Sequence, residues 1–404
     1  MSRKKKKWMK FRHRVITEIV RWPMYFYSRW KYGVTIERFK GQTGRQYLIL
    51  LNHQTVFDQF FVGLAFKGPL YYLATEDIFS NGWVSTLIRY LVAPIPIKKQ
   101  ATDVAAVINC MRVVKEGGSI ALAPEGNRTY SGKTEYINPA IVPLVKKMKL
   151  PVALFRIEGG YGVQPRWSDT IRKGKMRAYV SRVIEPEEYS ELTNEAVYSL
   201  ICEGLNVNEG SVRGRFLDRK SAEYIERAMY VCPYCGLSVL ESSGDIVRCT
   251  GCDRRIRYLP TKELEGVGFE FAFRFMTEWY DYQCDFVNQL DLSPYVEKPL
   301  YQDSARLSEV IVYQKKNILR QEARITLYGD RIIVDEGSER ELRFPFEEIS
   351  AVSVLGRNKL NIYHDKRIYQ LKGDKRFNAL KYVNIYYRSK NIDRGDGKGK
   401  FLGL

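Results

Sequence analysis

Two short stretches of sequence decide the fold, Asn-His-Gln-Thr-Val-Phe-Asp at residues 52–58 and Ala-Pro-Glu-Gly-Asn-Arg-Thr at residues 123–129. An apolar run leads into each stretch, residues 47–51 in the first case and residues 120–123 in the second. Such runs are typical of buried strands, so each stretch lies where a strand ends and the chain turns. Because α/β folds place their chemistry at strand ends, we expect a functional site here.

The first stretch combines a histidine with a carboxylate, His53 and Asp58. A neutral imidazole can take a proton from a hydroxyl, and a nearby carboxylate holds it in the required tautomer. Five residues of regular helix would turn the two side chains about 140° apart. We therefore expect His53 in a turn and Asp58 in the first turns of the next helix, with Thr55 as its N-cap. The alternative is a capped helix beside an unrelated histidine. The other histidines, His13 and His364, lie in basic sequence that predicts exposure.

The second stretch offers groups that suit a phosphate. Gly126 lets a ligand approach the backbone, and Arg128 presents a planar fork of donors. Asn-His-x4-Asp, followed some seventy residues later by Pro-Glu-Gly-x-Arg-Thr, resembles the glycerolipid acyltransferases, above all the 1-acyl-glycerol-3-phosphate acyltransferase family. The resemblance covers roughly residues 8–205 and implies an α/β acyltransferase domain.

The resemblance also implies a chemistry. His53 is then the base that activates an acceptor hydroxyl for attack on an acyl thioester, Asp58 orients it, and no acyl-enzyme forms. The donor is acyl-CoA or acyl carrier protein. The acceptor is a lysophospholipid, above all 1-acyl-glycerol 3-phosphate, in phospholipid synthesis; glycerol 3-phosphate or a lyso-aminolipid is the alternative. The residues that hold the acceptor are Lys99, Glu125, Gly126, Asn127, Arg128 and Thr129.

The chain departs from the family pattern at two of these positions. Lys99 stands where the family has an arginine, which keeps the charge but loses the bidentate fork. Asn127 stands where threonine is common in the family. Another family block, an apolar strand with a proline, is matched by residues 150–154.

The net charge is strongly basic, +19, and is concentrated at one end. Residues 1–31 contain eleven Lys and Arg against one acid, Glu18. Aromatic side chains recur at helical spacing between residues 8 and 30, which favours an interfacial helix on an anionic membrane surface over nucleic acid. The alternative is a helix packed on its own domain. Residues 354–390 are also basic, so the C-terminal region is either a second lipid contact or a solvated face.

Four of the seven cysteines form two Cys-x2-Cys pairs, and the ligands that these pairs offer are Cys232, Cys235, Cys249 and Cys252. This spacing predicts a four-cysteine zinc ribbon with a structural zinc ion, since a closed thiolate shell leaves no position for catalysis. Zinc ribbons often occur in nucleic-acid proteins. A non-catalytic protein that binds membranes or nucleic acid on the same fold therefore stays open as a second hypothesis.

The cysteine pairs also indicate a reducing compartment. The sequence has no run of about eighteen apolar residues, so no transmembrane helix is predicted. The start of the chain lacks the features of a signal peptide. We therefore expect a cytoplasmic protein that lies peripherally on the inner face of the membrane.

Hydrophobic periodicity predicts the arrangement along the chain. Strands are expected near 46–52, 70–74, 119–123, 152–157 and 176–184, and helices near 56–67, 81–91, 101–116, 139–149 and 188–206. Their alternation predicts an α/β domain with a largely parallel sheet. Further on we expect a helix over 269–290, short strands between 308 and 371, and a helix over 376–388. The strands and final helix resemble the pleckstrin-homology folds.

The expected segments follow from these patterns. They are an amphipathic membrane-interface helix (1–31), the acyltransferase domain (32–206), a connector with the zinc ribbon (207–260), a helical linker (261–299), a small PH-like, mainly-β domain closed by a helix (300–390) and a disordered tail (391–404).

Overall fold

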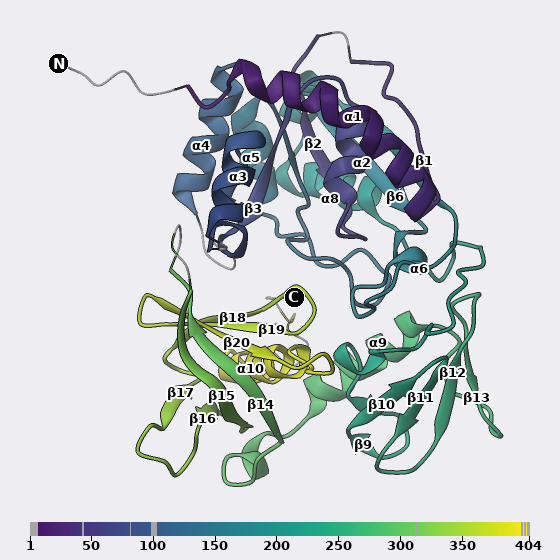
Figure 1. Cartoon of the computed structure of the whole chain (residues 1–404), viewed down its shortest axis with the longest axis vertical. Helices are drawn as coiled ribbons and strands as arrows, with labels where there is room; N and C mark the ends of the chain where they lie inside the picture. Colours follow the sequence, from purple (N-terminus) through teal and green to yellow (C-terminus); the bar gives the residue numbers. More distant parts are fainter. Residues whose placement is uncertain are drawn as a thin grey trace. The chain divides into compact units, whose positions relative to one another are not determined.

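The computed structural model describes residues 7–42, 44–80, 82–97, 103–311, 314, 316–396, 399 and 401. The chain divides into two compact units. Unit 1 runs up to Pro165 and takes in Ile171–Leu217, and unit 2 consists of Arg166–Thr170 and the chain from Asp218 onward (Figure 1).

Unit 1 is built on a seven-stranded sheet, counted over the described residues, with the order β1-β7-β6-β2-β5-β3-β4. Its strands are β1 Val34–Ile36, β2 Leu48–Leu51, β3 Leu70–Thr75, β4 Ile95–Ile97, β5 Ser119–Leu122, β6 Val152–Glu158 and β7 Met176–Ile184. Neighbouring strands are parallel except β6 and β7, which are antiparallel. The sheet is therefore mixed, and the sequence analysis missed the short strands β1 and β4.

Helices of unit 1 follow the predicted positions closely. They are α1 Phe11–Tyr32, α2 Asp58–Ala65, α3 Trp83–Leu91, α4 Val104–Lys115, α5 Ile141–Met148, α6 Gly160–Val163, α7 Pro186–Ser190 and α8 Asn194–Leu205, with a 3-10 turn η1 at Glu76–Ser80. The single helix expected over 188–206 is two helices, because Thr193 caps α8 by accepting a hydrogen bond from the Ala196 N–H.

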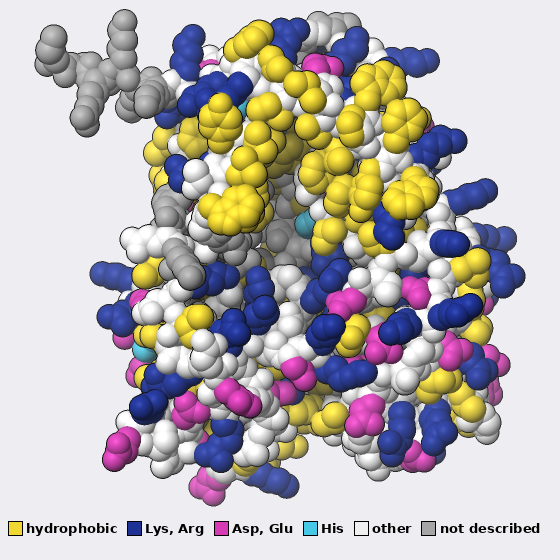
Figure 2. Space-filling model, in the orientation of Figure 1, with side chains coloured by type: hydrophobic (Ala, Val, Ile, Leu, Met, Phe, Trp, Pro, Cys, Tyr) yellow, Lys and Arg dark blue, Asp and Glu magenta, His cyan; other side chains and the backbone are white. Residues whose placement is uncertain are grey.

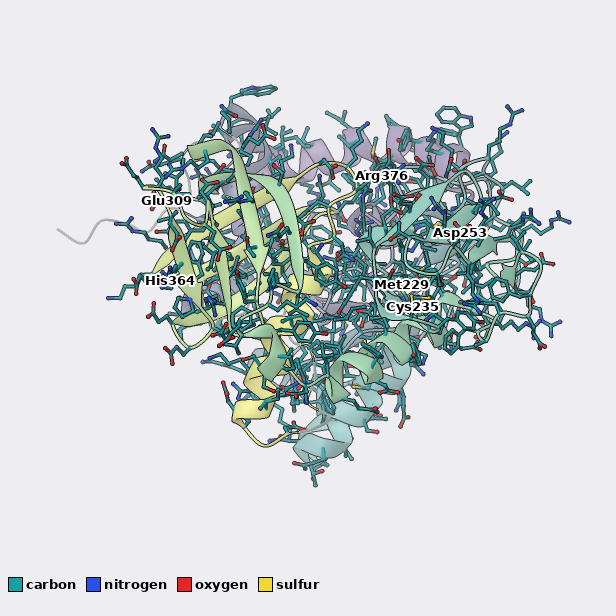
Figure 3. All side chains as sticks on the ribbon, turned by 90° about the horizontal axis from the view of Figure 1, so that it is seen from below. Met229, Cys235, Asp253, Glu309, His364 and Arg376 are labelled. Atoms are coloured by element: carbon teal, nitrogen blue, oxygen red, sulfur yellow. The ribbon has the colours of Figure 1, made fainter. Side chains whose placement is uncertain are left out.

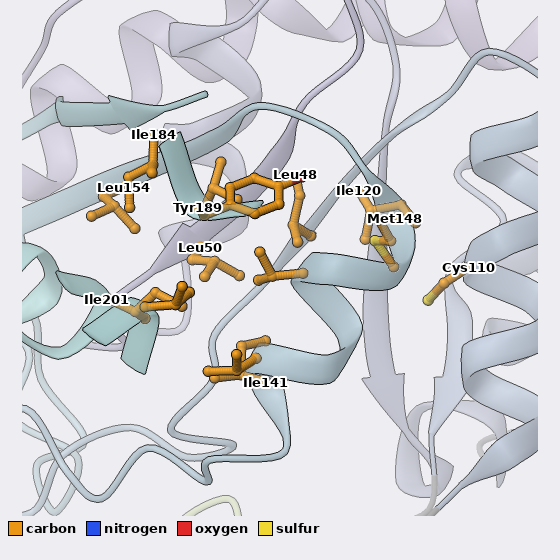
Figure 4. Close-up of a cluster of buried hydrophobic side chains, with 14 of the residues drawn as sticks. Leu48, Leu50, Cys110, Ile120, Ile141, Met148, Leu154, Ile184, Tyr189 and Ile201 are labelled. Atoms are coloured by element: carbon orange, nitrogen blue, oxygen red, sulfur yellow. The ribbon is translucent and has the colours of Figure 1, made fainter. Parts of the chain in front are cut away.

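Two apolar clusters cover the two faces of this sheet. Alternate residues of β2 point to opposite sides, since side chains alternate along a strand. Leu48 and Leu50 join a cluster with residues of α4, α5 and α8 (Figure 4), whereas Ile49 and Leu51 join one with residues of α1 and α2. Each fully buried aliphatic side chain contributes about 1.5–3 kcal/mol. The sheet is thus held between helices, and its strand ends are rigid supports for the loops that follow.

Helix α1 packs one side on unit 1 and leaves its aromatic side exposed. His13 is buried with its Nδ1 3.0 Å from the Tyr71 hydroxyl, so the prediction that His13 is exposed is wrong. Burial, together with the charges of Arg12 and Lys10, lowers the pKa of His13. The exposed apolar side chains of the helix are Phe11, Val15, Ile19, Val20, Trp22, Phe26 and Trp30.

Two residues, Trp8 and Arg21, are placed differently from what the predicted amphipathic helix implies. Trp8 lies before the helix and packs inward, where its indole N–H donates to the Ala93 carbonyl. Arg21 turns toward the domain and donates to the Phe66 carbonyl oxygen at 2.9 Å. Gly33 ends the helix at a φ of 62°, and a Cβ there would lie 2.1 Å from the Gly174 oxygen. Among the described residues, no helix has the length and apolar character needed to cross a membrane.

Unit 2 begins with a small four-stranded sheet in the order β10-β11-β12-β13. The elements of this part are β8 Val231–Cys232, β9 Gly236–Leu237, β10 Leu240–Ser243, β11 Ile246–Cys249, β12 Arg255–Tyr258, β13 Leu264–Gly266, the 3-10 turns η2 Ile225–Arg227 and η3 Ser293–Tyr295, and helix α9 Met276–Gln289. The Trp279 indole donates to the Val231 carbonyl, and Gln283 Oε1 accepts from the Tyr230 N–H. Helix α9 is therefore packed on the β8 hairpin, and the helical linker expected over 261–299 stays a prediction.

The rest of unit 2 is a second seven-stranded sheet of described residues, in the order β17-β16-β15-β14-β20-β19-β18. Its elements are β14 Tyr301–Glu309, β15 Asn317–Leu327, β16 Arg331–Val334, β17 Leu342–Pro345, β18 Ile349–Leu355, β19 Lys359–His364, β20 Arg367–Gly373 and helix α10 Leu380–Asp393. A mainly-β C-terminal region closed by a helix is confirmed. The pleckstrin-homology resemblance stays a prediction.

Three expected boundaries need correction. Helix α10 extends to Asp393, so residues 391–393 are helical and do not belong to a disordered tail. Residues 207–217 of the expected connector belong to unit 1, where Phe216 is buried in the cluster beneath α1 and α2. Arg166–Thr170 belong to unit 2, although they lie within the expected acyltransferase domain.

Candidate active site

The two motif loops meet at one edge of the sheet of unit 1. Strands β2 and β5 are parallel neighbours, so their carboxyl ends lie side by side. The loop after β2 carries His53, and the loop after β5 carries Glu125. The His53 backbone N–H donates to Glu125 Oε1 at 2.7 Å, and the His53 carbonyl accepts from the Thr129 N–H at 3.1 Å. The two motifs therefore form one site.

His53 and Asp58 form a hydrogen-bonded pair. Nδ1 of His53 lies 2.8 Å from Oδ2 of Asp58. The Asp58 side chain is only 1% exposed, whereas that of His53 is 27% exposed. The carboxylate favours the tautomer with the proton on Nδ1, which leaves Nε2 as the acceptor of a proton from a substrate.

The Asp58 carboxylate is held by the residues of its own turn. It accepts hydrogen bonds from the Gln54 N–H at 2.6 Å, from the Thr55 N–H at 3.0 Å and from the Thr55 hydroxyl at 2.6 Å. Helix α2 begins at Asp58 with Phe57 in the N-cap position, so Thr55 is not the N-cap. The Thr55 hydroxyl instead accepts from the Phe57 N–H and donates to Asp58. The expected placement, His53 in a turn and Asp58 in the first helical turn, is what the structure has.

Three amide side chains fix the His53 loop, and the sequence analysis gave none of them a role. The Asn52 amide pairs with the N–H and C=O of Ile157 on β6. Gln54 Oε1 accepts from the Tyr161 N–H, and Gln164 Oε1 accepts from the Val56 N–H. Each contact joins residues more than a hundred positions apart, so local sequence patterns could not reveal these contacts. The one sign of them in the sequence is that polar residues lie on either side of His53.

Glu125 acts as a bridge between two loops. Its Oε1 accepts from the His53 N–H and its Oε2 accepts from the Glu135 N–H, both at 2.7 Å. Burial is the main influence and raises the pKa of Glu125 well above its usual value, whereas the two backbone donors lower it. Each of the two oxygens therefore accepts a backbone N–H from a different loop.

The rest of the second motif is folded tightly beneath the turn. Gly126 has a φ of 71°, a conformation that favours glycine, and a Cβ there would meet no atom within 4 Å. Asn127, Arg128 and Thr129 are buried. The Thr129 hydroxyl donates to Glu135 Oε1 at 3.1 Å, so Glu135, which the sequence analysis also missed, supports the motif from within.

Tyr32, at the end of α1, has a pKa that charged residues of both motifs influence. Burial raises its pKa, the nearby Asp58 carboxylate adds to the rise, and the positive charge of Arg128 opposes it. The Tyr32 ring also stacks on Phe57, with 5.1 Å between the centroids. Asp58 and Arg128 therefore both lie near the buried Tyr32 hydroxyl. Lys99, the remaining residue of the predicted acceptor site, lies outside the described residues.

The cysteine cluster lies in unit 2. The Sγ atoms of Cys232, Cys235, Cys249 and Cys252 all lie within 4.8 Å of one another. Two of the separations are 3.7 Å (Cys232 to Cys252) and 3.4 Å (Cys235 to Cys249). Tetrahedral coordination with zinc–sulfur bonds of about 2.3 Å requires sulfurs about 3.8 Å apart. The four side chains therefore fit a metal ion of that size.

Unit 2 also contains a cavity of about 980 Å³. Met229 and Arg376, labelled together with Cys235 of the cysteine cluster in Figure 3, both line it. Charged residues of its lining are paired: Arg376 with Glu223 at 3.2 Å, and Lys381 with Asp303 at 2.8 Å. These pairs hold the wall of the cavity together and do not indicate a ligand.

Comparison with known proteins gives a family match for part of unit 1. Residues 34–157 match the family model described as Acyltransferase. Among solved structures, one similar chain is the 1-acyl-sn-glycerophosphate (LPA) acyltransferase PlsC from Thermotoga maritima, with 21% sequence identity, 49% of this chain and 82% of that chain covered, and a TM-score of 0.40. The comparison with curated proteins found no match. Residues 34–157, which include His53, Asp58 and the Glu125–Thr129 turn, are thus an acyltransferase-family domain.

Proposed function

We propose that unit 1 transfers a fatty acyl group from an acyl thioester to the hydroxyl of a lysophospholipid. The observation that carries this proposal is the His53–Asp58 pair at 2.8 Å, which lies within the acyltransferase-family segment. A neutral imidazole oriented by a buried carboxylate is a general base, and a hydroxyl acceptor needs one.

The reaction proceeds by direct transfer. Nε2 of His53 takes the proton of the acceptor hydroxyl as the oxygen attacks the thioester carbonyl. The C–S bond then breaks as the new ester forms, and the imidazolium returns its proton to the departing thiolate. Asp58 stabilises the imidazolium, because its carboxylate is held in place beside the ring by N–H and O–H donors.

The acceptor that suits the second motif carries a phosphate. Arg128 precedes Thr129, whose N–H donates to the His53 carbonyl, so its turn lies against the His53 loop, and the open backbone at Gly126 admits a ligand. We favour 1-acyl-glycerol 3-phosphate, with glycerol 3-phosphate and lyso-aminolipids as alternatives. Acyl-CoA or acyl carrier protein is the donor.

We further propose that the protein works at the cytoplasmic face of an anionic membrane. The aromatic side of α1 supports this location, since Trp22, Phe26 and Trp30 are exposed and do not pack on the domain. The alternative was a helix packed on its own domain, and α1 does pack its other side on unit 1, so the proposal rests on the aromatic side that this packing leaves exposed. In unit 2, we propose that the four cysteines hold a structural zinc ion.

The test is acyl transfer from labelled acyl-CoA to a panel of acceptors that includes 1-acyl-glycerol 3-phosphate, glycerol 3-phosphate and a lyso-aminolipid. His53→Ala should remove nearly all transfer. The matched control is His364→Ala, which removes a histidine of unit 2 that lies beside Glu348. Thermal unfolding of both variants shows whether the fold is retained. A folded His53→Ala variant that transfers acyl groups at the wild-type rate would overturn the mechanism.

A further inference from the structure

Helix α3 presents its apolar side to solvent. Trp83, Leu87 and Tyr90 follow one another at spacings of four and three residues and therefore share one face. All three are exposed, and Trp83 is 76% exposed. The buried residue of this helix is Ser85, whose hydroxyl donates to the Ile78 carbonyl. Helix α3 thus leaves uncovered the apolar face that an ordinary surface helix buries.

The outward face of α3 is joined to α1. The Arg12 side chain of α1 donates from Nε to the Tyr90 carbonyl at 2.9 Å, and its guanidinium lies 4.0 Å from the centre of the Tyr90 ring. Figure 2 shows hydrophobic side chains gathered over α1 and over α3 on the same face of the molecule, with a hollow between the two groups. The apolar sides of the two helices therefore belong to one surface.

A path of aromatic rings connects α1 to the His53 loop. Trp30 and Tyr27 have ring centroids 6.3 Å apart, Tyr27 and Phe57 are 5.3 Å apart, and Phe57 and Phe60 are 4.6 Å apart. Val56, which precedes Phe57, and Phe60, three residues after it, are exposed. The turn between His53 and Asp58 therefore lies at the edge of the apolar surface.

The charges on this surface identify its partner. The exposed charges in α1 are the cations Arg14, Arg29 and Lys31 and one acid, Glu18. In α3 the single charged residue is Arg89. Aromatic and aliphatic side chains beside an excess of cations suit the interface of an anionic bilayer, where the rings enter the headgroup region and the cations meet phosphate.

We propose that α3 is a second membrane-contacting helix, and that α1 and α3 bind one anionic phospholipid bilayer together at the edge of the His53 loop. This inference deepens the proposed function: the acyl acceptor reaches His53 from the bilayer and not from solution. That second part rests on the proposed function, whereas the membrane contact of α3 does not.

The test uses the full chain and vesicles of phosphatidylcholine and phosphatidylglycerol in equal parts. We expect the double variant Trp83→Ser/Leu87→Ser to lower vesicle co-sedimentation at least tenfold in high salt, because salt screens the cations but not the apolar contact. Trp83→Phe/Leu87→Met, which keeps the apolar character, should restore it. Leu217→Ser is the matched control: Leu217 is 50% exposed and pairs with Lys173, which lies just before β7, at the opposite end of the sheet from α3.

Two results would overturn the proposal. One is wild-type vesicle binding by the folded Trp83→Ser/Leu87→Ser variant in high salt. The other is a wild-type protein that is dimeric in solution and a variant that is monomeric but binds vesicles as the wild type does. The apolar face of α3 would then bind a second copy of the chain and not the bilayer. Because vesicle binding is measured without acyl transfer, a protein that binds through α3 but transfers no acyl group would refute the proposed function alone.

Discussion

Replacing Asp58 with Asn tests the role of the buried carboxylate most directly. Oδ2 of Asp58 faces three donors, the His53 ring and the N–H groups of Gln54 and Thr55, whereas Oδ1 faces the Thr55 N–H and hydroxyl. The new carboxamide keeps its oxygen toward His53 and turns its NH2 toward Thr55, whose hydroxyl can rotate to accept. The variant should therefore fold, with a loss of about 1–3 kcal/mol, because the Thr55 N–H then faces the new NH2 group and keeps only the oxygen on the His53 side as an acceptor.

The catalytic loss should exceed the loss of stability. The imidazolium that forms during transfer loses an opposite charge at 2.8 Å in a site where the carboxylate is 1% exposed. The equivalent change in a serine protease triad lowers kcat by about 10⁴. We expect a fall in kcat of about 10³–10⁴, which corresponds to about 4–5.5 kcal/mol of transition-state stabilisation.

The assay is steady-state transfer from labelled acyl-CoA to the best acceptor, with kcat and KM determined separately and thermal unfolding measured in parallel. KM for both substrates should change little, because neither substrate needs Asp58 for binding. Thr55→Ser keeps the hydroxyl and serves as the control for disturbance of the turn. If the folded Asp58→Asn variant kept more than a tenth of the wild-type kcat, the orienting role of the carboxylate would be refuted.

Three further predictions concern the neighbouring residues and the metal. Glu125→Gln places an NH2 group against the backbone N–H of His53 or Glu135, so kcat should fall about ten- to a hundredfold and the melting temperature should drop; unchanged kinetics would contradict the bridging role. Arg128→Ala should raise KM for a phosphate acceptor about ten- to a hundredfold and leave KM for the thioester unchanged; the opposite pattern would exchange the assigned substrates. Elemental analysis should find one zinc per chain, chelation should unfold the ribbon before the rest, and Cys249→Ser should lose the ion while Cys284→Ser keeps it; protein purified without chelator and free of metal would refute the site.

Local pattern was enough to place His53 and Asp58. Strand β2 ends at Leu51 and helix α2 begins at Asp58, within two residues of the predicted boundaries. The reason is that a buried strand and a turn both depend on short-range features, an apolar run and the residues that follow it. The five-residue spacing then excluded a single helix for His53 and Asp58, and the structure has the turn that this argument required.

Contacts across the chain could not be predicted in the same way. Glu125 was expected to hold substrate, yet both of its oxygens accept backbone N–H groups of the site loops. His13 lies in a basic stretch and was expected to be exposed, but α1 turns it toward Tyr71. Both depend on which residues from distant parts of the chain pack against them, and a single sequence does not contain that information.

The sequence by itself determined most of the order of strands and helices, the pairing of His53 with Asp58 and the four cysteines that can hold a metal, because each rests on spacing within a short segment. Only the tertiary structure decided which face of each helix is covered. Periodicity identifies the apolar faces of α1 and α3 but cannot show whether protein or lipid meets them. The fold buries Ser85 and His13 and leaves Trp83 and Trp30 exposed, since the apolar clusters of the sheet are completed by other side chains.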